Sequence, residues 1–123
     1  MGVDCLFVYG TLRRGSNNKF ARLLEDRAQF LGAARVAGRL YDLGPYPGAV
    51  ASNQPDDRVH GELHRLTDPQ LLPLLDDYEG AEFERASVAA QIENGERVEC
   101  WIYWYRGAEK GRRILSGDWF LRV

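Results

Sequence analysis

The sequence predicts an α+β fold in which a curled β-sheet is accompanied by short helices. Several segments have the alternation or β-branched and aromatic content of strands, and two have apolar residues at helical spacing. The chain of 123 residues has the size of one domain and can bury a core without disulfides. We therefore expect a single domain over residues 1–123, with its sheet closed into a barrel that removes exposed strand edges.

The first strand is predicted over residues 4–9, which are almost wholly apolar, so this strand is expected to be buried on both faces. Gly10 lets the chain turn, and the polar residues 11–17 form a loop before a helix. Backbone N–H groups in such a connection can face an anion or a carbonyl oxygen. On the local pattern alone, an ordinary connecting turn is favoured over a binding loop.

A helix is predicted over residues 18–28, with an asparagine at its start as the N-cap. Residues 30–41 then have an extended pattern. Gly32 and Gly38 within that pattern are candidates for a β-bulge or for a close approach of another strand.

The middle of the chain is predicted to contain a loop and two strands. Residues 43–48 hold two prolines and two glycines, which exclude a helix and a central strand, and residues 48–51 resume a strand. Residues 58–66 alternate between apolar and polar side chains, as in a half-buried strand. We expect His60 and His64 on its exposed face.

The second helix is predicted to open at Thr67-Asp68-Pro69, where a capping residue precedes a proline. Leucines at helical spacing follow. Pro73 lies among them and predicts a kink or two short helical pieces, and Gly80 is expected to end the helix.

The last third of the chain is predicted to be a β-hairpin and a closing segment. Residues 83–92 and 97–105 are the two strands, and Asn94-Gly95 between them is a strong turn signal. Residues 107–113 are interpreted as a charged loop. Residues 114–123 close the chain, with a turn at Gly117-Asp118 and with Trp119 in the core.

Composition excludes some classes of function. The net charge of −2 gives no support to nucleic-acid binding, and no apolar run approaches the ~18 residues of a membrane span. The N-terminus has no basic residues before its apolar stretch, unlike a signal peptide. Cys5 and Cys100 lie in predicted strands, and two free buried thiols fit a reducing compartment, so we expect a cytoplasmic protein.

Familiar metal and nucleophile motifs are not found in the sequence. His60 and His64 lie roughly 13 Å apart along a strand, which makes joint zinc ligation improbable. There is no Gly-x-Ser-x-Gly and no phosphate-binding loop of the Gly-x4-Gly-Lys type. The prediction is therefore of a site without a metal.

Acidic residues crowd the C-terminal end of the second predicted helix at Asp76, Asp77 and Glu79. The helix dipole disfavours each carboxylate there by about 0.3–1 kcal/mol, and such broken local rules concentrate at functional sites. A carboxylate held against Tyr78 would also be harder to ionise, as suits a general base near neutral pH. On this argument alone, a solvated acidic helix end remains the favoured interpretation.

Taken together, five stretches resemble the γ-glutamylcyclotransferase-like family, in its short branch with a Tyr-Gly-Thr-Leu loop that includes γ-glutamylamine cyclotransferases. The longer glutathione-degrading relatives carry Tyr-Gly-Ser at this loop, and Thr11 argues against that branch. The stretches, in order, are Val8-Tyr9-Gly10-Thr11-Leu12-Arg13-Arg14-Gly15, Leu40-Tyr41-Asp42-Leu43-Gly44 with Tyr46-Pro47-Gly48, Val59-His60-Gly61-Glu62-Leu63, Leu75-Asp76-Asp77-Tyr78-Glu79-Gly80 and Ser116-Gly117-Asp118-Trp119.

This resemblance implies a small mixed β-barrel with peripheral short helices and one cavity. It implies that Tyr9, Gly10, Thr11 and Leu12 bind the γ-glutamyl group and that Glu79 is the catalytic acid and base. The implied reaction is that of a lyase, which releases an amine and 5-oxoproline from a γ-glutamyl amide without a metal or cofactor. A non-catalytic module of the same fold that binds a small carboxylate is the alternative. The leaving amine and the oligomeric state stay open.

Overall fold

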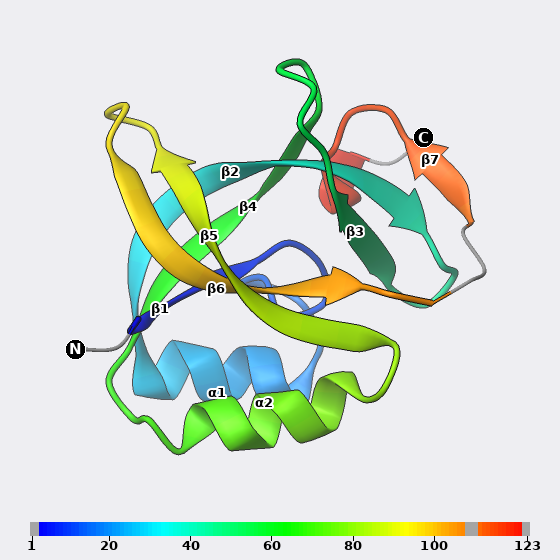
Figure 1. Ribbon diagram of the computed structural model, residues 1–123. Coiled ribbons are helices and arrows are strands. Elements are labelled where there is room, and N and C mark those ends of the chain that lie inside the picture. The colour runs from blue at the N-terminus through cyan, green and yellow to red at the C-terminus, as the bar shows by residue number, and fades with distance from the viewer. Residues whose placement is uncertain (1–2, 108–110, 122–123) are drawn as a thin grey trace.

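The computed structural model describes residues 3–107 and 111–121 (Figure 1). Two helices, seven strands and one short 3₁₀ helix follow one another along this part of the chain. In order they are β1 (Cys5–Val8), α1 (Lys19–Arg27), β2 (Ala28–Asp42), β3 (Pro47–Ala51), β4 (Arg58–Leu66), α2 (Leu71–Glu79), β5 (Phe83–Ile92), β6 (Arg97–Tyr105), β7 (Arg112–Ile114) and the 3₁₀ helix Trp119–Leu121.

The sheet closes into a barrel, as expected. Strands β2, β4, β1, β6 and β5 are joined in that order, and β5 returns to pair with β2. The β1–β6 pairing is parallel and the other pairings are antiparallel, so the barrel is mixed. Strands β3 and β7 extend the sheet beyond the barrel by pairing with β2. The two helices lie side by side along one side of the barrel (Figure 1).

Strand β1 is the interior strand around which two apolar layers meet, which confirms the predicted burial on both faces. Cys5 and Phe7 belong to the barrel core, whereas Leu6 and Val8 belong to a second apolar cluster beneath the helices. All four side chains are at most 3% exposed. Burying one such large side chain stabilises a fold by roughly 1.5–3 kcal/mol, so β1 anchors both layers.

Helix α1 forms as predicted, with the side chain of Asn18 accepting hydrogen bonds from two backbone N–H groups of its first turn. Helix α2 differs from the prediction because it begins at Leu71 rather than at residues 67–69. Pro73 therefore lies in the first turn, where a missing N–H breaks no helical hydrogen bond. The predicted kink is wrong, and α2 is one continuous helix that ends at Gly80.

Strand β4 is buried on both faces, which corrects the prediction for one histidine. His64 is only 1% exposed and Glu62 only 9% exposed. The ring of Phe30 lies 5.5 Å from that of His64, and the loop after β1 covers Glu62. The alternating pattern was typical of a half-buried strand, but the face that it left polar is covered by distant parts of the chain.

The predicted hairpin is confirmed, since β5 and β6 pair along their length and Gly95 turns between them with a positive φ of 89°. Part of the predicted loop over residues 107–113 is instead strand β7, which pairs with the end of β2. Arg113 also donates a 2.7 Å hydrogen bond to Asp57. Residues 108–110 and 122–123 lie outside the described residues. Trp119 is buried, as predicted.

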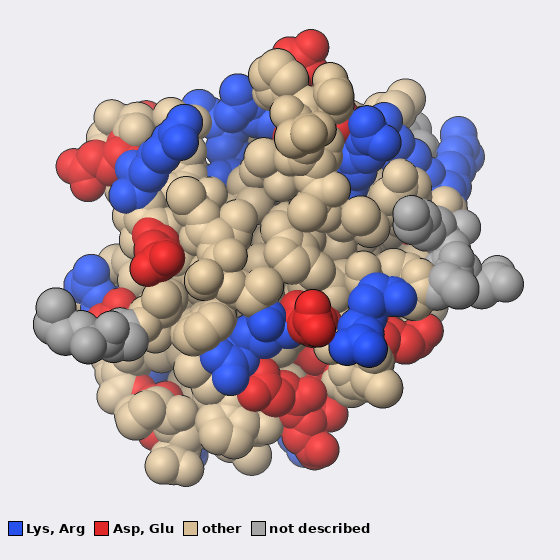
Figure 2. All heavy atoms as spheres, in the orientation of Figure 1, with Lys and Arg blue, Asp and Glu red and all other residues tan. Residues whose placement is uncertain are grey.

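The described surface carries both signs of charge. On the face in Figure 2, basic and acidic side chains are interspersed and no broad basic patch is visible. Each of the two α-helices has nine residues, and no described helix is long and apolar enough to cross a membrane.

Candidate active site

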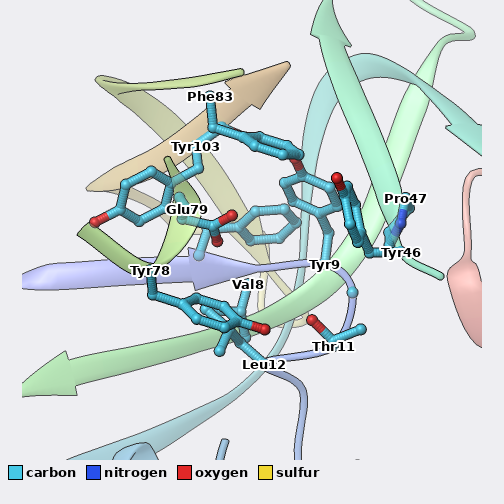
Figure 3. A pocket seen from close by; sticks show the side chains of 12 residues that line it. Val8, Tyr9, Thr11, Leu12, Tyr46, Pro47, Tyr78, Glu79, Phe83 and Tyr103 are labelled. Atoms are coloured by element: carbon cyan, nitrogen blue, oxygen red, sulfur yellow. The ribbon is translucent and has the colours of Figure 1, made fainter. Parts of the chain in front are cut away.

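A cavity of about 160 Å³ opens between the loop after β1 and the C-terminal end of α2. Residues from β1, its loop, the start of β3, α2, β5 and β6 surround it (Figure 3). The lining residues are Phe7, Val8, Tyr9, Gly10, Thr11, Leu12, Tyr46, Pro47, Tyr78, Glu79, Phe83 and Tyr103. The structure thus brings together all five residues that the sequence assigned to the site, Tyr9, Gly10, Thr11, Leu12 and Glu79.

Tyr9 fixes the start of the loop. Its hydroxyl donates a 2.6 Å hydrogen bond to the backbone carbonyl oxygen of Tyr103 and accepts a 3.2 Å hydrogen bond from the backbone N–H of Ala49. Burial raises the pKa of this phenol far above its usual value, so Tyr9 stays neutral. These two hydrogen bonds connect Tyr9, which lines the cavity, to β6 and β3.

The loop itself begins with a tight turn, in which the N–H of Arg13 donates a 3.1 Å hydrogen bond to the carbonyl oxygen of Gly10. The N–H groups of Gly10, Thr11 and Leu12 have no hydrogen-bond acceptor in the described part of the chain. These three residues line the cavity. The loop therefore offers a run of backbone donors, together with the Thr11 hydroxyl, to a ligand with negatively charged or carbonyl oxygens.

Glu79 is the last residue of α2 and lies, half-buried, across the cavity from the loop. Figure 3 shows its carboxyl group at the centre of the cavity, with Tyr9 and Tyr78 around it. Burial raises the pKa of Glu79 to about 7. Among residues 3–107 and 111–121, none forms a hydrogen bond or ion pair with this carboxylate, and burial is the one cause of its raised pKa. It is therefore poised to gain and lose a proton near neutral pH.

The three acids at the end of α2 turn out to have different surroundings. Asp77 is exposed. Asp76 accepts hydrogen bonds from Arg85 at 2.8 Å and 3.1 Å and from the hydroxyl of Tyr103 at 2.7 Å. Burial raises the pKa of Asp76, but these bonds from Arg85 and Tyr103 outweigh it and leave that pKa lowered. Asp76 is exposed, as expected of a surface charge, but it also binds the hydroxyl of Tyr103, which lines the cavity.

The aromatic walls of the cavity were largely missed by the sequence analysis. The rings of Tyr46 and Phe83 lie 5.9 Å apart, and Asn18 donates a 2.8 Å hydrogen bond to the hydroxyl of Tyr78. Tyr46 belongs to one of the stretches that carried the family resemblance. Tyr103 lies in the predicted strand 97–105, whose aromatic residues alternate; core packing was favoured for it over a place at the cavity. Tyr78 was noted as an apolar neighbour of the acids, but Phe83 gave no signal, because partners distant in sequence place it at the cavity.

The described residues contain no group of three or more histidine, cysteine or acidic side chains that could hold a metal ion. Cys5 and Cys100 are both free and buried. The chemistry that the cavity itself offers is a proton transfer through one carboxyl group, beside a loop of hydrogen-bond donors and within aromatic walls.

Comparison with known proteins identifies relatives over almost the whole chain. Residues 6–121 match the sequence model of a family described as gamma-glutamyl cyclotransferase, AIG2-like. A Vibrio cholerae protein is 38% identical over 120 residues, which cover 96% of each chain. The Escherichia coli K12 protein named gamma-glutamylcyclotransferase family protein YtfP is 36% identical, over 95% of this chain and 96% of its own.

Solved structures share the fold as well. The crystal structure of an AIG2-like protein from Mus musculus superposes with a TM-score of 0.72 and 28% identity, over 88% of this chain and 81% of that one. A protein from Pyrococcus horikoshii has a TM-score of 0.70 over 96% of this chain and 90% of its own, and its 23% identity supports the likeness of fold alone.

Proposed function

The chain belongs to the gamma-glutamyl cyclotransferase, AIG2-like, family, and we propose that it converts a γ-glutamyl amide into 5-oxoproline and a free amine. Glu79 is the general base and acid of this reaction. The residues Tyr9, Gly10, Thr11 and Leu12 bind the γ-glutamyl group. The observation that supports this most directly is a carboxyl group with a pKa of about 7 in the same cavity as the donor-rich loop.

In the proposed reaction the substrate supplies both reacting groups. Its α-nitrogen attacks its own γ-carbonyl carbon, which forms the five-membered ring, and the bond from that carbon to the leaving nitrogen breaks. Because the attack is intramolecular, no nucleophile from the protein is needed, and bending the substrate supplies much of the rate enhancement. The aromatic walls favour the bent form by excluding water around it.

Glu79 moves the proton in this scheme. As a carboxylate it takes a proton from the α-ammonium group, which frees the amine for attack, and as a carboxylic acid it returns a proton to the leaving nitrogen. The attacking nitrogen loses its second proton once the ring has closed, so 5-oxoproline keeps one N–H and the leaving group, which gains two protons in all, departs as an ammonium ion. The atoms therefore balance without added water or a cofactor. The backbone donors of Gly10, Thr11 and Leu12 stabilise the substrate carboxylate or the oxyanion that forms during attack.

The proposal is tested by incubating the protein with a panel of γ-glutamyl compounds and measuring 5-oxoproline release. The panel contains γ-glutamyl adducts of a lysine side chain, of free amino acids and of polyamines, which share the γ-glutamyl end but differ in the leaving amine. We expect release from at least one class. Binding of 5-oxoproline without release from any of them would instead identify a non-catalytic module.

The pH dependence of kcat/KM is expected to have an acid limb near pH 7. The base must be ionised, and the pKa of Glu79 is raised from 4.5 to about 7 by burial. Below that pH the rate should fall about tenfold per pH unit, because the proton acceptor is lost in proportion. Measuring kcat/KM between about pH 5 and pH 9 checks this, and a profile that is flat down to about pH 5 would contradict the assignment.

A further inference from the structure

Glu62 is a buried carboxylate directly beneath the binding loop but outside the cavity. It lies on β4 opposite Val8, the last residue of β1. One of its oxygens accepts a 2.8 Å hydrogen bond from the backbone N–H of Arg14, and the other lies 3.5 Å from Nε of Arg13. Nε2 of His64 lies 3.5 Å from the first oxygen. Glu62 therefore holds the loop by its backbone and by one side chain.

Arg13 also connects Glu62 to residues near the C-terminal end of the described chain. Its guanidinium donates a 2.7 Å hydrogen bond to Asp118 and lies 3.9 Å from the ring centroid of Phe120. The Arg13 side chain is only 12% exposed, so its charge is balanced by Glu62 and Asp118 in a region of low dielectric. The carboxylates of Glu62 and Asp118, from two distant parts of the chain, thus both contact the guanidinium group of Arg13.

The position of Arg13 in the loop shows which backbone turns its contacts with Glu62 and Asp118 hold in place. Arg13 closes one turn by donating its N–H to Gly10, and its carbonyl oxygen accepts a 3.1 Å hydrogen bond from the N–H of Ser16 in the next turn. The first turn contains Thr11 and Leu12, whose N–H groups have no acceptor in the described part of the chain. Among the described residues, the bond between Arg13 and Gly10 is the one backbone hydrogen bond within this turn, so the contacts that fix Arg13 also fix the direction of the unpaired donors.

We propose that Glu62, Arg13 and Asp118 form a clamp that positions the Gly10–Leu12 loop for substrate binding, with Glu62 as its central positioning residue. The expected effect on substrate binding rests on the proposed function, whereas the effect of the clamp on the conformation of the loop does not. Glu62 does not line the cavity, so its expected effect is on substrate affinity and not on proton transfer.

The charged form of Glu62 suits this role. Burial raises the pKa of Glu62, but His64, the N–H of Arg14 and the charge of Arg13 outweigh it, and the pKa is lowered overall. Glu62 therefore stays ionised at neutral pH and keeps both contacts.

Two variants separate these contacts. Glu62→Gln keeps an oxygen for the N–H of Arg14 but loses the charge that faces Arg13, and Glu62→Ala loses both. On a substrate found with the γ-glutamyl panel, we expect KM to rise about threefold in Glu62→Gln and about tenfold or more in Glu62→Ala, with kcat within about twofold. Glu96→Gln, the same change at an exposed acid of the β5–β6 turn, is the matched control and should match wild type.

A second readout does not depend on activity. Backbone hydrogen exchange of Arg13 and Arg14, whose N–H groups are bonded to Gly10 and Glu62, should be faster in both Glu62 variants than in wild type and unchanged in the Glu96 control. If Glu62→Ala does not fold, Glu62→Gln carries the test. Unchanged exchange in these residues, or a loss confined to kcat or to the melting temperature, overturns the clamp.

The two proposals can fail separately. If wild-type protein releases no 5-oxoproline from any γ-glutamyl compound, the proposed function falls, and the hydrogen exchange of Arg13 and Arg14 still decides whether the clamp holds the loop. If wild type is active and Glu62→Ala leaves KM within about twofold, the clamp is overturned while the proposed function stands.

Discussion

Glu79→Gln is expected to lower turnover by on the order of 10²-fold or more while the chain stays folded. Glutamine has the shape and hydrogen-bonding capacity of glutamate but cannot accept the proton that ring closure releases. A loss of 10²-fold corresponds to about 2.7 kcal/mol in the activation barrier. Steady-state kinetics of 5-oxoproline release measure it, and KM should change far less than kcat.

The effect of the same change on stability should have the opposite sign. Because the pKa of Glu79 is raised from 4.5 to about 7, the folded state holds a proton that the unfolded state has lost between these values. The stability contributed by this group is present below pH 4.5 and is lost as the pH rises through about 7. At about pH 8, therefore, Glu79→Gln should melt at a temperature no lower than wild type. Loss of activity with undiminished stability would separate catalysis from folding.

Asp77→Asn is the matched control for Glu79→Gln. It makes the same chemical change two residues away on α2, at an exposed side chain, and should leave turnover nearly unchanged. Asp76→Asn cannot serve as a control, because Asp76 anchors Tyr103 and Arg85. Equal losses in Glu79→Gln and Asp77→Asn, or full activity in Glu79→Gln, would mean that the acids are a solvated helix end.

Gly10→Ala is expected to reduce substrate affinity about tenfold or more, and Gly10→Val still further. The sequence analysis explained Gly10 by the freedom of glycine to turn, but Gly10 does not have a positive φ. The physical reason is space, because a Cβ atom at Gly10 would lie 2.6 Å from Cγ and 2.7 Å from Cδ of Pro47. Both residues line the cavity, so relieving the clash must move the loop or the opposite wall. Binding of 5-oxoproline measured by calorimetry checks the loss.

The double variant Gly10→Ala/Pro47→Ala tests this explanation. Removing the proline ring makes room for the new methyl group, so the double variant should recover part of the affinity that Gly10→Ala loses. Pro47→Ala alone reports the cost of the missing ring. Unchanged 5-oxoproline affinity in folded Gly10→Ala would show that the close approach of Gly10 and Pro47 does not shape the binding site.

The elements that the sequence predicted well are those whose signal is local. Residues 4–9 could be assigned as a buried strand because nearly every side chain is apolar, and the hairpin because Asn94-Gly95 adopts the required turn. The burial of His64 and the strand β7 could not be predicted in this way. Each depends on a partner far along the chain, Phe30 in one case and the end of β2 in the other.

At the candidate site, too, local sequence signals could be recognised and contacts between distant parts of the chain could not. Glu79 stood out because acids at the end of a helix oppose its dipole, and the resemblance to a family added the loop of residues 9–12. The acidic pattern alone could not separate Asp76 from Glu79, and only the family resemblance pointed to Glu79. The physical difference lies in Arg85 and Tyr103, which β5 and β6 bring to Asp76. The clamp at Glu62 was hidden in a strand whose alternation predicted exposure.

The pairing of β1 has a consequence for how the chain folds. β1 joins β4 on one side and the much later β6 on the other, so the barrel closes through contacts between segments distant in sequence. Topologies dominated by such contacts fold slowly, on the order of milliseconds to seconds, because chain entropy is lost before the pairings form. During synthesis, β1 therefore keeps one edge unpaired until β6 has left the ribosome. Aggregation of newly made chains should therefore be most sensitive to substitutions that slow the docking of β6.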